Sequence, residues 1–100
     1  MFDIDKERFL RLYDSFERKK EGTQLKKLAE EQQELNNALL LWQYGLNPIE
    51  DVIQELADNF ILLYQHMYAN EIEPEELKNV ILEKLDRTDK RILSGYYDKH

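Results

Sequence analysis

Residues 30–34 read Glu30-Glu31-Gln32-Gln33-Glu34, and residues 55–58 read Glu55-Leu56-Ala57-Asp58. Each segment holds two carboxylates three residues apart, and on an α-helix such a pair projects from neighbouring turns of one face. No His or Cys joins the two pairs at a matching spacing. Ligand sets made only of oxygen favour Mg²⁺ or Mn²⁺ over Zn²⁺ or iron. The pattern therefore predicts two helices that place four carboxylates around a hard divalent cation: Glu31, Glu34, Glu55 and Asp58.

The residues around these acids predict an all-α fold. Only three glycines and two prolines interrupt the chain, and β-branched residues do not form alternating runs, so helices are expected throughout. The first helix is expected from about Asp3 to Lys20, closed by Gly22, and the second from an N-cap at Thr23 to about Tyr44. The third is expected to start at Pro48 with Asn47 as its cap and to run to about Tyr68, and the fourth to run from Pro74 to near Gly95.

Each expected helix carries an apolar stripe at three-and-four spacing, which predicts its inward face. In chain order the stripes are Ile4, Phe9, Leu12, Tyr13 and Phe16; Leu25, Leu28, Leu35, Ala38, Leu39 and Trp42; Ile49, Val52, Ile53, Leu56, Phe60 and Leu63; and Leu77, Ile81, Leu85, Thr88 and Ile92. At about 100° per residue, Glu31 points into the second stripe. A charge there is costly unless it is paired or bound to metal, so Glu31 is a functional candidate.

Length and composition restrict the class of protein. One hundred residues with 42% hydrophobic content predict a single domain over 1–100 with a modest core, for which oligomerisation is a natural supplement. Cysteine is absent, so disulfides and thiolate metal sites are excluded. The net charge of −7 disfavours nucleic acid as a partner. The absence of a long apolar run and of a signal-like N-terminus predicts a cytoplasmic protein without a membrane segment.

Basic and aromatic residues suggest contacts to a phosphate compound. Lys84, Arg87 and Arg91 form a row on the fourth expected helix and are candidates for binding phosphate oxygens; ion pairing with neighbouring acids or simple solvation is the alternative. Lys27 lies one turn before Glu31 and is either a phosphate contact or a counter-ion. Trp42 is a candidate for stacking on a nucleobase and Asn59 for hydrogen bonding to it, although the first suits a core or interface position equally well and the second an ordinary polar one.

The two acidic segments resemble the EExxE and ExxD motifs of the all-α nucleoside triphosphate pyrophosphohydrolases, which include MazG proteins, dimeric dUTPases and phosphoribosyl-ATP pyrophosphatase. The resemblance covers about residues 23–97. It implies a four-helix MazG-like bundle, a homodimer or dimer of dimers whose active sites are completed by neighbouring subunits, and a Mg²⁺-dependent hydrolase that converts a nucleotide substrate to its monophosphate and pyrophosphate. It also implies that Glu31, Glu34, Glu55 and Asp58 are the metal ligands.

The chain departs from the family pattern in one place and leaves other functions open. Asn59 stands where an apolar residue usually follows the aspartate, and the side chain of Glu30 is expected to point away from Glu31. No residue identifies the base of the substrate. The alternatives are a non-catalytic acidic helical bundle that serves as an interaction or regulatory module, and hydrolysis of phosphoribosyl-ATP.

Overall fold

All regular structure in the described chain is helical. The computed structural model describes residues 6–96 and 98, and no strand occurs among them. The four helices are α1 (Lys6–Lys19), α2 (Thr23–Gln43), α3 (Ile49–Ala69) and α4 (Pro74–Leu93). The predicted all-α class is therefore confirmed. The expected start of the first helix, with Ile4 of its stripe, lies outside the described residues.

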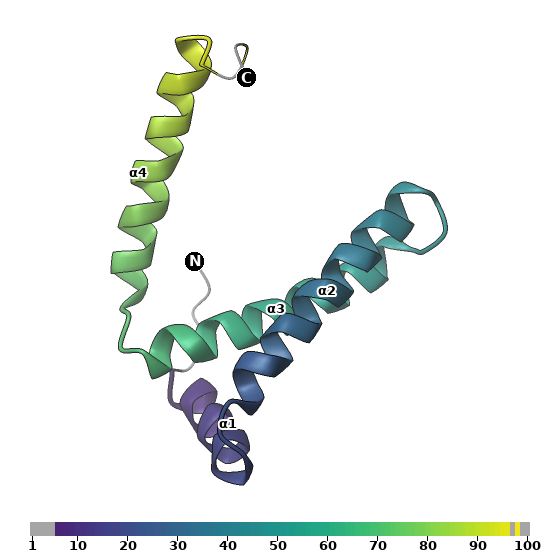
Figure 1. The fold of residues 1–100 in the computed structure, drawn as a ribbon, viewed down its shortest axis with the longest axis vertical. Helices are drawn as coiled ribbons and strands as arrows, with labels where there is room; N and C mark the ends of the chain where they lie inside the picture. Colours follow the sequence, from purple (N-terminus) through teal and green to yellow (C-terminus); the bar gives the residue numbers. More distant parts are fainter. Residues whose placement is uncertain (1–5, 97, 99–100) are drawn as a thin grey trace.

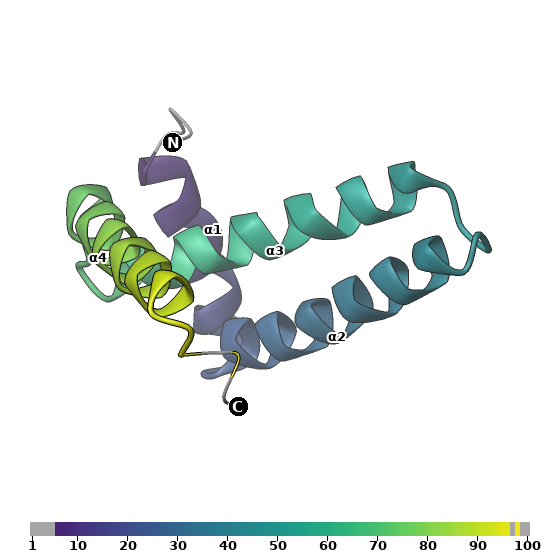
Figure 2. The same cartoon turned by 90° about the horizontal axis from the view of Figure 1, so that it is seen from above.

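The four helices form an open arrangement. Helices α2 and α3 lie side by side as an antiparallel hairpin, and α1 packs across one end of it (Figures 1 and 2). Helix α4 leaves from that same end and projects away from the hairpin (Figure 1). The radius of gyration is 17.0 Å, whereas a compact domain of this length has about 13 Å. The single chain is thus more extended than a closed bundle.

Two helix starts differ from the sequence prediction by one residue. Gly22, with φ of 84°, is the N-cap of α2, and the predicted cap Thr23 instead donates its hydroxyl hydrogen to the carbonyl of Lys20. Pro48 rather than Asn47 is the N-cap of α3. In neither case does the N-cap residue use its own side chain; at the start of α2 the carboxylate of Glu17 instead accepts from the backbone N–H groups of Gly22 and Gln24, at 2.6 and 3.3 Å.

The α2–α3 seam, the strip along which these two helices face each other, contains polar as well as apolar side chains. On α2 the buried residues are Gln24, Glu31 and Ala38, with Leu28 and Leu35 partly buried between them. On α3 the residues at the corresponding positions are Val52, Glu55, Asn59 and Leu62. These steps of three and four residues are those of two helices packed along their length. The seam therefore follows helical periodicity but is not purely apolar.

The stripes predicted to form the core lie largely outside this seam, which corrects the sequence prediction. Ile53 is 55% exposed, and seven other members of the second and third stripes are also exposed: Leu25, Leu39, Trp42, Ile49, Leu56, Phe60 and Leu63. Both helices have apolar residues on more than one face, and a two-helix hairpin can bury only the narrow strip between them. The wider apolar face remains open in the single chain.

Aromatic residues hold α1 against α3. Phe9 is buried against Tyr64 and Met67, with Tyr68 beside them, and the ring centroids of Phe9 and Tyr64 are 5.6 Å apart. Burial of large rings with offset stacking stabilises such a contact beyond the area removed from water. This cluster fixes α1 at the end of the hairpin where α4 begins.

Helix α4 is well formed but has no buried residue. Its start is specified locally, because Pro74 is in the first turn and Glu76 accepts a hydrogen bond of 3.3 Å from the backbone N–H of Glu73. The predicted inner face is exposed, with Leu85 at 56%. The four expected helices are therefore present, but within the described residues α1, α2 and α3 pack together while α4 buries none of its residues. No described helix has both the length and the hydropathy needed to cross a membrane.

Candidate metal centre and adjoining cavity

Three of the four predicted carboxylates converge at the middle of the hairpin. Glu31, Glu34 and Glu55 each offer a carboxylate oxygen, and these oxygens lie within 4.8 Å of one another. Glu31 is only 5% exposed. Oε2 of Glu31 and Oε2 of Glu55 are buried and accept no hydrogen bond from the described residues. We call these three residues the acidic cluster.

Helical geometry explains why the acidic cluster forms. Glu31 occupies a seam position of α2, Glu34 follows one turn later at the margin, and Glu55 occupies a seam position of α3. The amide nitrogen Nδ2 of Asn59 donates to the backbone carbonyls of Glu31 and Glu55, each at 2.8 Å. The amide therefore joins the two helices at the level of the carboxylates. The sequence signal for this linking role was the polar residue Asn59 itself, which stands one helical turn after Glu55 on the same face of α3.

The acidic cluster has one nearby cation. Nζ of Lys27 lies 3.0 Å from Oε1 of Glu31. The hydrogen bond from Lys27 lowers the pKa of Glu31 against the opposing effect of burial, and the same contact raises the pKa of Lys27. Burial raises the pKa of Glu55, and the charges of Glu34, Glu31 and Asp58 raise it further. The ammonium group of Lys27 thus stabilises the ionised form of Glu31, whereas Glu55 lies among carboxylates that disfavour its ionised form.

The residues present fit a hard divalent cation. Three carboxylates supply only oxygen ligands, as Mg²⁺ and Mn²⁺ prefer. Buried carboxylate oxygens without a donor are costly unless a cation or hydrogen bond compensates them. The two unpartnered Oε2 atoms are such a pair, and they belong to facing helices. Glu30, which belongs to the same motif, is exposed and is not part of the cluster.

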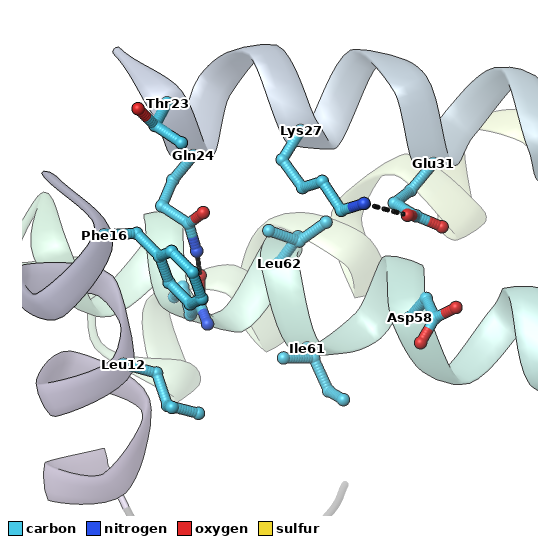
Figure 3. A pocket seen from close by; sticks show the side chains of 10 residues that line it. Leu12, Phe16, Thr23, Gln24, Lys27, Glu31, Asp58, Ile61 and Leu62 are labelled. Atoms are coloured by element: carbon cyan, nitrogen blue, oxygen red, sulfur yellow. Dashed lines mark hydrogen bonds and ion pairs between the residues drawn. The ribbon is translucent and has the colours of Figure 1, made fainter. Parts of the chain in front are cut away.

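Asp58 lies beside the acidic cluster rather than within it. Its side chain is exposed and lines a cavity together with Lys27 and Glu31 (Figure 3). Its charge contributes to the raised pKa of Glu55, so it is close enough to act on the cluster electrostatically. The structure therefore brings together three predicted ligands and places the fourth at the mouth of the adjoining cavity.

The predicted phosphate-binding residues of α4 lie away from the acidic cluster. Lys84, Arg87 and Arg91 are exposed on a helix that projects from the hairpin (Figure 1). The guanidinium of Arg91 lies over the ring of Tyr96, 5.0 Å from its centroid. Of the four predicted phosphate contacts, only Lys27 is at the site within one chain.

The two residues proposed to bind a base are also placed elsewhere. Trp42 is exposed near the far end of α2 and does not line the cavity beside Glu31. Asn59 is buried with its amide nitrogen engaged by two carbonyls. Its observed contacts are those of a residue that positions the helices.

A cavity of about 530 Å³ opens beside the acidic cluster between α1, α2 and α3. Lys27, Glu31 and Asp58 line one end, and the other end is lined mainly by apolar side chains and two amides: Leu12, Phe16, Gln24, Ile61, Leu62 and Gln65 (Figure 3). Sequence reasoning did not identify Gln24 or Gln65 as functional candidates. For Gln24 the sequence did contain a signal: Gln24, Glu31 and Ala38 are spaced seven residues apart, which places them on one face of the helix.

No family model matches this chain, and neither a curated protein nor a solved structure matches it. The resemblance to MazG-type enzymes therefore stays a prediction based on the two acidic motifs.

Proposed function

We propose that the protein is a Mg²⁺-dependent nucleotide pyrophosphohydrolase, which hydrolyses a nucleoside triphosphate to the monophosphate and pyrophosphate. The observation that supports this proposal best is the acidic cluster, in which buried carboxylate oxygens on facing helices have no donor. Such a cluster is unfavourable in the empty protein and suited to a divalent cation. The cavity beside it has room for a substrate.

Glu31, Glu34 and Glu55 would hold the metal, and Asp58 would complete the ligand set from the cavity side. Bound Mg²⁺ or Mn²⁺ supplies positive charge that neutralises phosphate oxygens and lowers the pKa of water. In the proposed reaction, water forms a bond to the α-phosphorus while the bond to the bridging oxygen breaks, and pyrophosphate leaves. Lys27, which lines that end of the cavity, would donate to a phosphate oxygen, since its ammonium group has two further donors besides the one used by Glu31.

We further propose that a second copy of the chain supplies the remaining phosphate contacts. Residues 28–77 contain no Lys or Arg, so the basic residues of the hairpin are Lys26 and Lys27 near the start of α2, which is little positive charge for a polyphosphate. Helix α4 carries Lys84, Arg87 and Arg91 beside an apolar stripe that its own chain leaves exposed. The wide apolar face of α2 and α3 is exposed as well. A homodimer, or a dimer of dimers, would bury both apolar faces and bring basic residues to acidic ones.

The experiment that tests the proposed activity is a panel of nucleoside triphosphates and diphosphates, including phosphoribosyl-ATP, incubated with the protein and Mg²⁺ or Mn²⁺. Release of pyrophosphate with formation of the monophosphate is expected for at least one triphosphate. Release of pyrophosphate from phosphoribosyl-ATP alone would support that narrower reaction instead. No phosphate product from any compound would favour a non-catalytic interaction module.

Site variants make the panel specific to the acidic cluster. Glu34→Gln and Asp58→Asn each remove one carboxylate with little change in volume, and each is expected to abolish turnover while the helical content by circular dichroism stays unchanged. Glu21→Gln in the loop between α1 and α2 is the matched control, since it removes an exposed acid that belongs neither to the cluster nor to α4. Full turnover in Glu34→Gln or Asp58→Asn would remove that residue from the mechanism.

A further inference from the structure

We propose that the cavity between α1, α2 and α3 binds the nucleobase of the substrate, with the amides of Gln24 and Gln65 recognising the base edge. This inference rests on the proposed function for the statement that the substrate is a nucleotide. The binding site itself is argued from the cavity alone. None of the residues considered for base recognition from the sequence takes part in it.

The amide pair is a buried polar site in an otherwise apolar region. Gln24 is 4% exposed and Gln65 is 3% exposed. Nε2 of Gln24 donates to Oε1 of Gln65, and neither side chain makes another hydrogen bond within residues 6–96 and 98. The pair therefore retains one carbonyl acceptor, Oε1 of Gln24, and the N–H donors of Gln65. An adjacent acceptor and donor are complementary to the hydrogen-bonding edge of a nucleobase.

The walls around the amides suit a flat, weakly polar ring. Phe16 and Leu12 from α1 line the cavity with the amides, and Ile61 lines it between them and Asp58 (Figure 3). No charged side chain is among the residues that line this end. An aromatic face stacks on a base, while a few placed polar groups determine which base fits. The cavity volume of about 530 Å³ is within the range of roughly 300–1,000 Å³ found for small-molecule sites.

The order of groups along the cavity matches the order of groups in a nucleotide. The amides and Phe16 are at one end, and Lys27, Glu31 and Asp58 are at the other, next to the acidic cluster (Figure 3). A nucleotide with its base at the amide end directs its phosphates toward Lys27 and the carboxylates. Base recognition and phosphate chemistry thus occupy one continuous cavity within a single chain.

The binding test uses nucleosides, which have no phosphate and need no metal. Uridine, thymidine, cytidine, adenosine and guanosine are titrated into the full-length ¹⁵N-labelled protein in EDTA, and the side-chain amide signals of Gln24 and Gln65 are followed by NMR. At least one nucleoside is expected to shift both signals. The signal of Gln33, an exposed residue later on α2 and on the face opposite to Gln24, is expected to stay unchanged.

Variants then test whether the amides determine selectivity. Gln65→Met keeps the length of the side chain but removes its donors, and it is expected to lower kcat/KM for the preferred triphosphate by about tenfold or more, mainly through KM, and to weaken the preference among bases. Phe16→Ala changes a half-exposed residue, so it leaves the fold intact and weakens binding of every nucleoside. Gln33→Met is the matched control and keeps the wild-type ranking.

The outcomes separate this proposal from the proposed function. Hydrolysis of nucleotides without any nucleoside-induced shift of Gln24 and Gln65, or an unchanged base ranking in a folded Gln65→Met variant, would overturn the base site while the enzyme remains. Shifts of both amides without hydrolysis of any triphosphate would support the base site and reject the pyrophosphohydrolase. Neither shifts nor hydrolysis would reject both.

Discussion

Glu31 and Glu55 belong to one acidic cluster but hold their protons differently. Lys27 lies against Glu31 and lowers its pKa, whereas burial and neighbouring carboxylates raise the pKa of Glu55. Glu31 therefore contributes stability above its ordinary pKa and loses that contribution as pH falls through its lowered folded value. Glu55 changes the stability in the opposite direction. The folded state binds the proton of Glu55 more strongly than the unfolded state does, so stability falls as pH rises from the ordinary pKa of this group, near 4.5, through its raised folded value.

Neutralising Glu55 is therefore expected to stabilise the metal-free protein. In EDTA at neutral pH, Glu55→Gln should have a higher melting temperature than wild type, because a charged group is removed from three like charges. The difference should shrink as pH is lowered toward the ordinary pKa of a glutamate. Thermal unfolding followed by circular dichroism at several pH values measures both effects.

The same variant should respond less to metal. A cation that binds only the folded state raises the melting temperature, so Mg²⁺ is expected to raise that of wild type, and Glu55→Gln should lose most of that rise. Glu21→Gln serves as the control and should keep it. A lower metal-free melting temperature in Glu55→Gln, with an undiminished response to Mg²⁺, would contradict the description of this cluster.

At the scale of elements, α2 and α3 pair through a seam that includes polar groups. Asn59 is its central link, because one side-chain nitrogen donates to carbonyls on both helices. Buried hydrogen bonds of this kind contribute about 1 kcal/mol each. The seam thus specifies the alignment of the two helices as well as their proximity, and that alignment sets the acidic cluster.

Removing this link should loosen the hairpin and the site together. Asn59→Ala is expected to lower the free energy of unfolding by about 1–3 kcal/mol and to weaken the stabilisation by Mg²⁺. Asn36→Ala, at an exposed position of α2, should change neither. Urea unfolding with and without Mg²⁺ measures both quantities, and wild-type values for Asn59→Ala would show that the amide does not align the helices.

At the scale of the whole molecule, the exposed apolar surface is too extensive for one chain. Helix α4 buries none of its residues, and the outer faces of α2 and α3 are exposed along their length. Large contiguous apolar surfaces on a protein generally mark a contact with a partner. The proposed homo-oligomer accounts for these surfaces and for the extended shape.

Substitutions on α4 test the proposed contact. The wild-type protein is expected to sediment as a dimer or larger, and the double variant Ile81→Asp with Leu85→Asp should shift toward the monomer, because burying two carboxylates in an apolar interface is costly. Asn79→Asp, which adds one charge outside the predicted apolar stripe, is the control. An unchanged molar mass by analytical ultracentrifugation in the double variant would exclude α4 from the contact.

A mixing experiment tests whether α4 acts on the other copy. Arg87→Ala and Glu55→Gln should each be inactive or nearly so, but a mixed dimer pairs intact acids of one chain with the intact α4 of the other. Free exchange in an equal mixture makes half of the dimers mixed, and each mixed dimer has one intact site of two, so mixing is expected to restore about a quarter of the wild-type activity. No recovery in a mixture shown to exchange subunits would place Arg87 at the site of its own chain, or outside the site.

The sequence by itself determined the all-α class, the four helices to within a few residues and the position of Glu31 and Glu34 one turn apart on one helix, because these depend on local periodicity and on spacing within a helix. Their predicted convergence with Glu55 required α2 and α3 to pack in one alignment, which the tertiary structure supplies. Only the tertiary structure decided which face each helix buries. Both hairpin helices have apolar residues on two faces, so periodicity alone favoured the wider stripe, while the observed seam includes Gln24, Glu31 and Asn59. The position of α4 and the pairing of Gln24 with Gln65 were likewise decided by contacts between residues far apart in the chain, which no local pattern encodes.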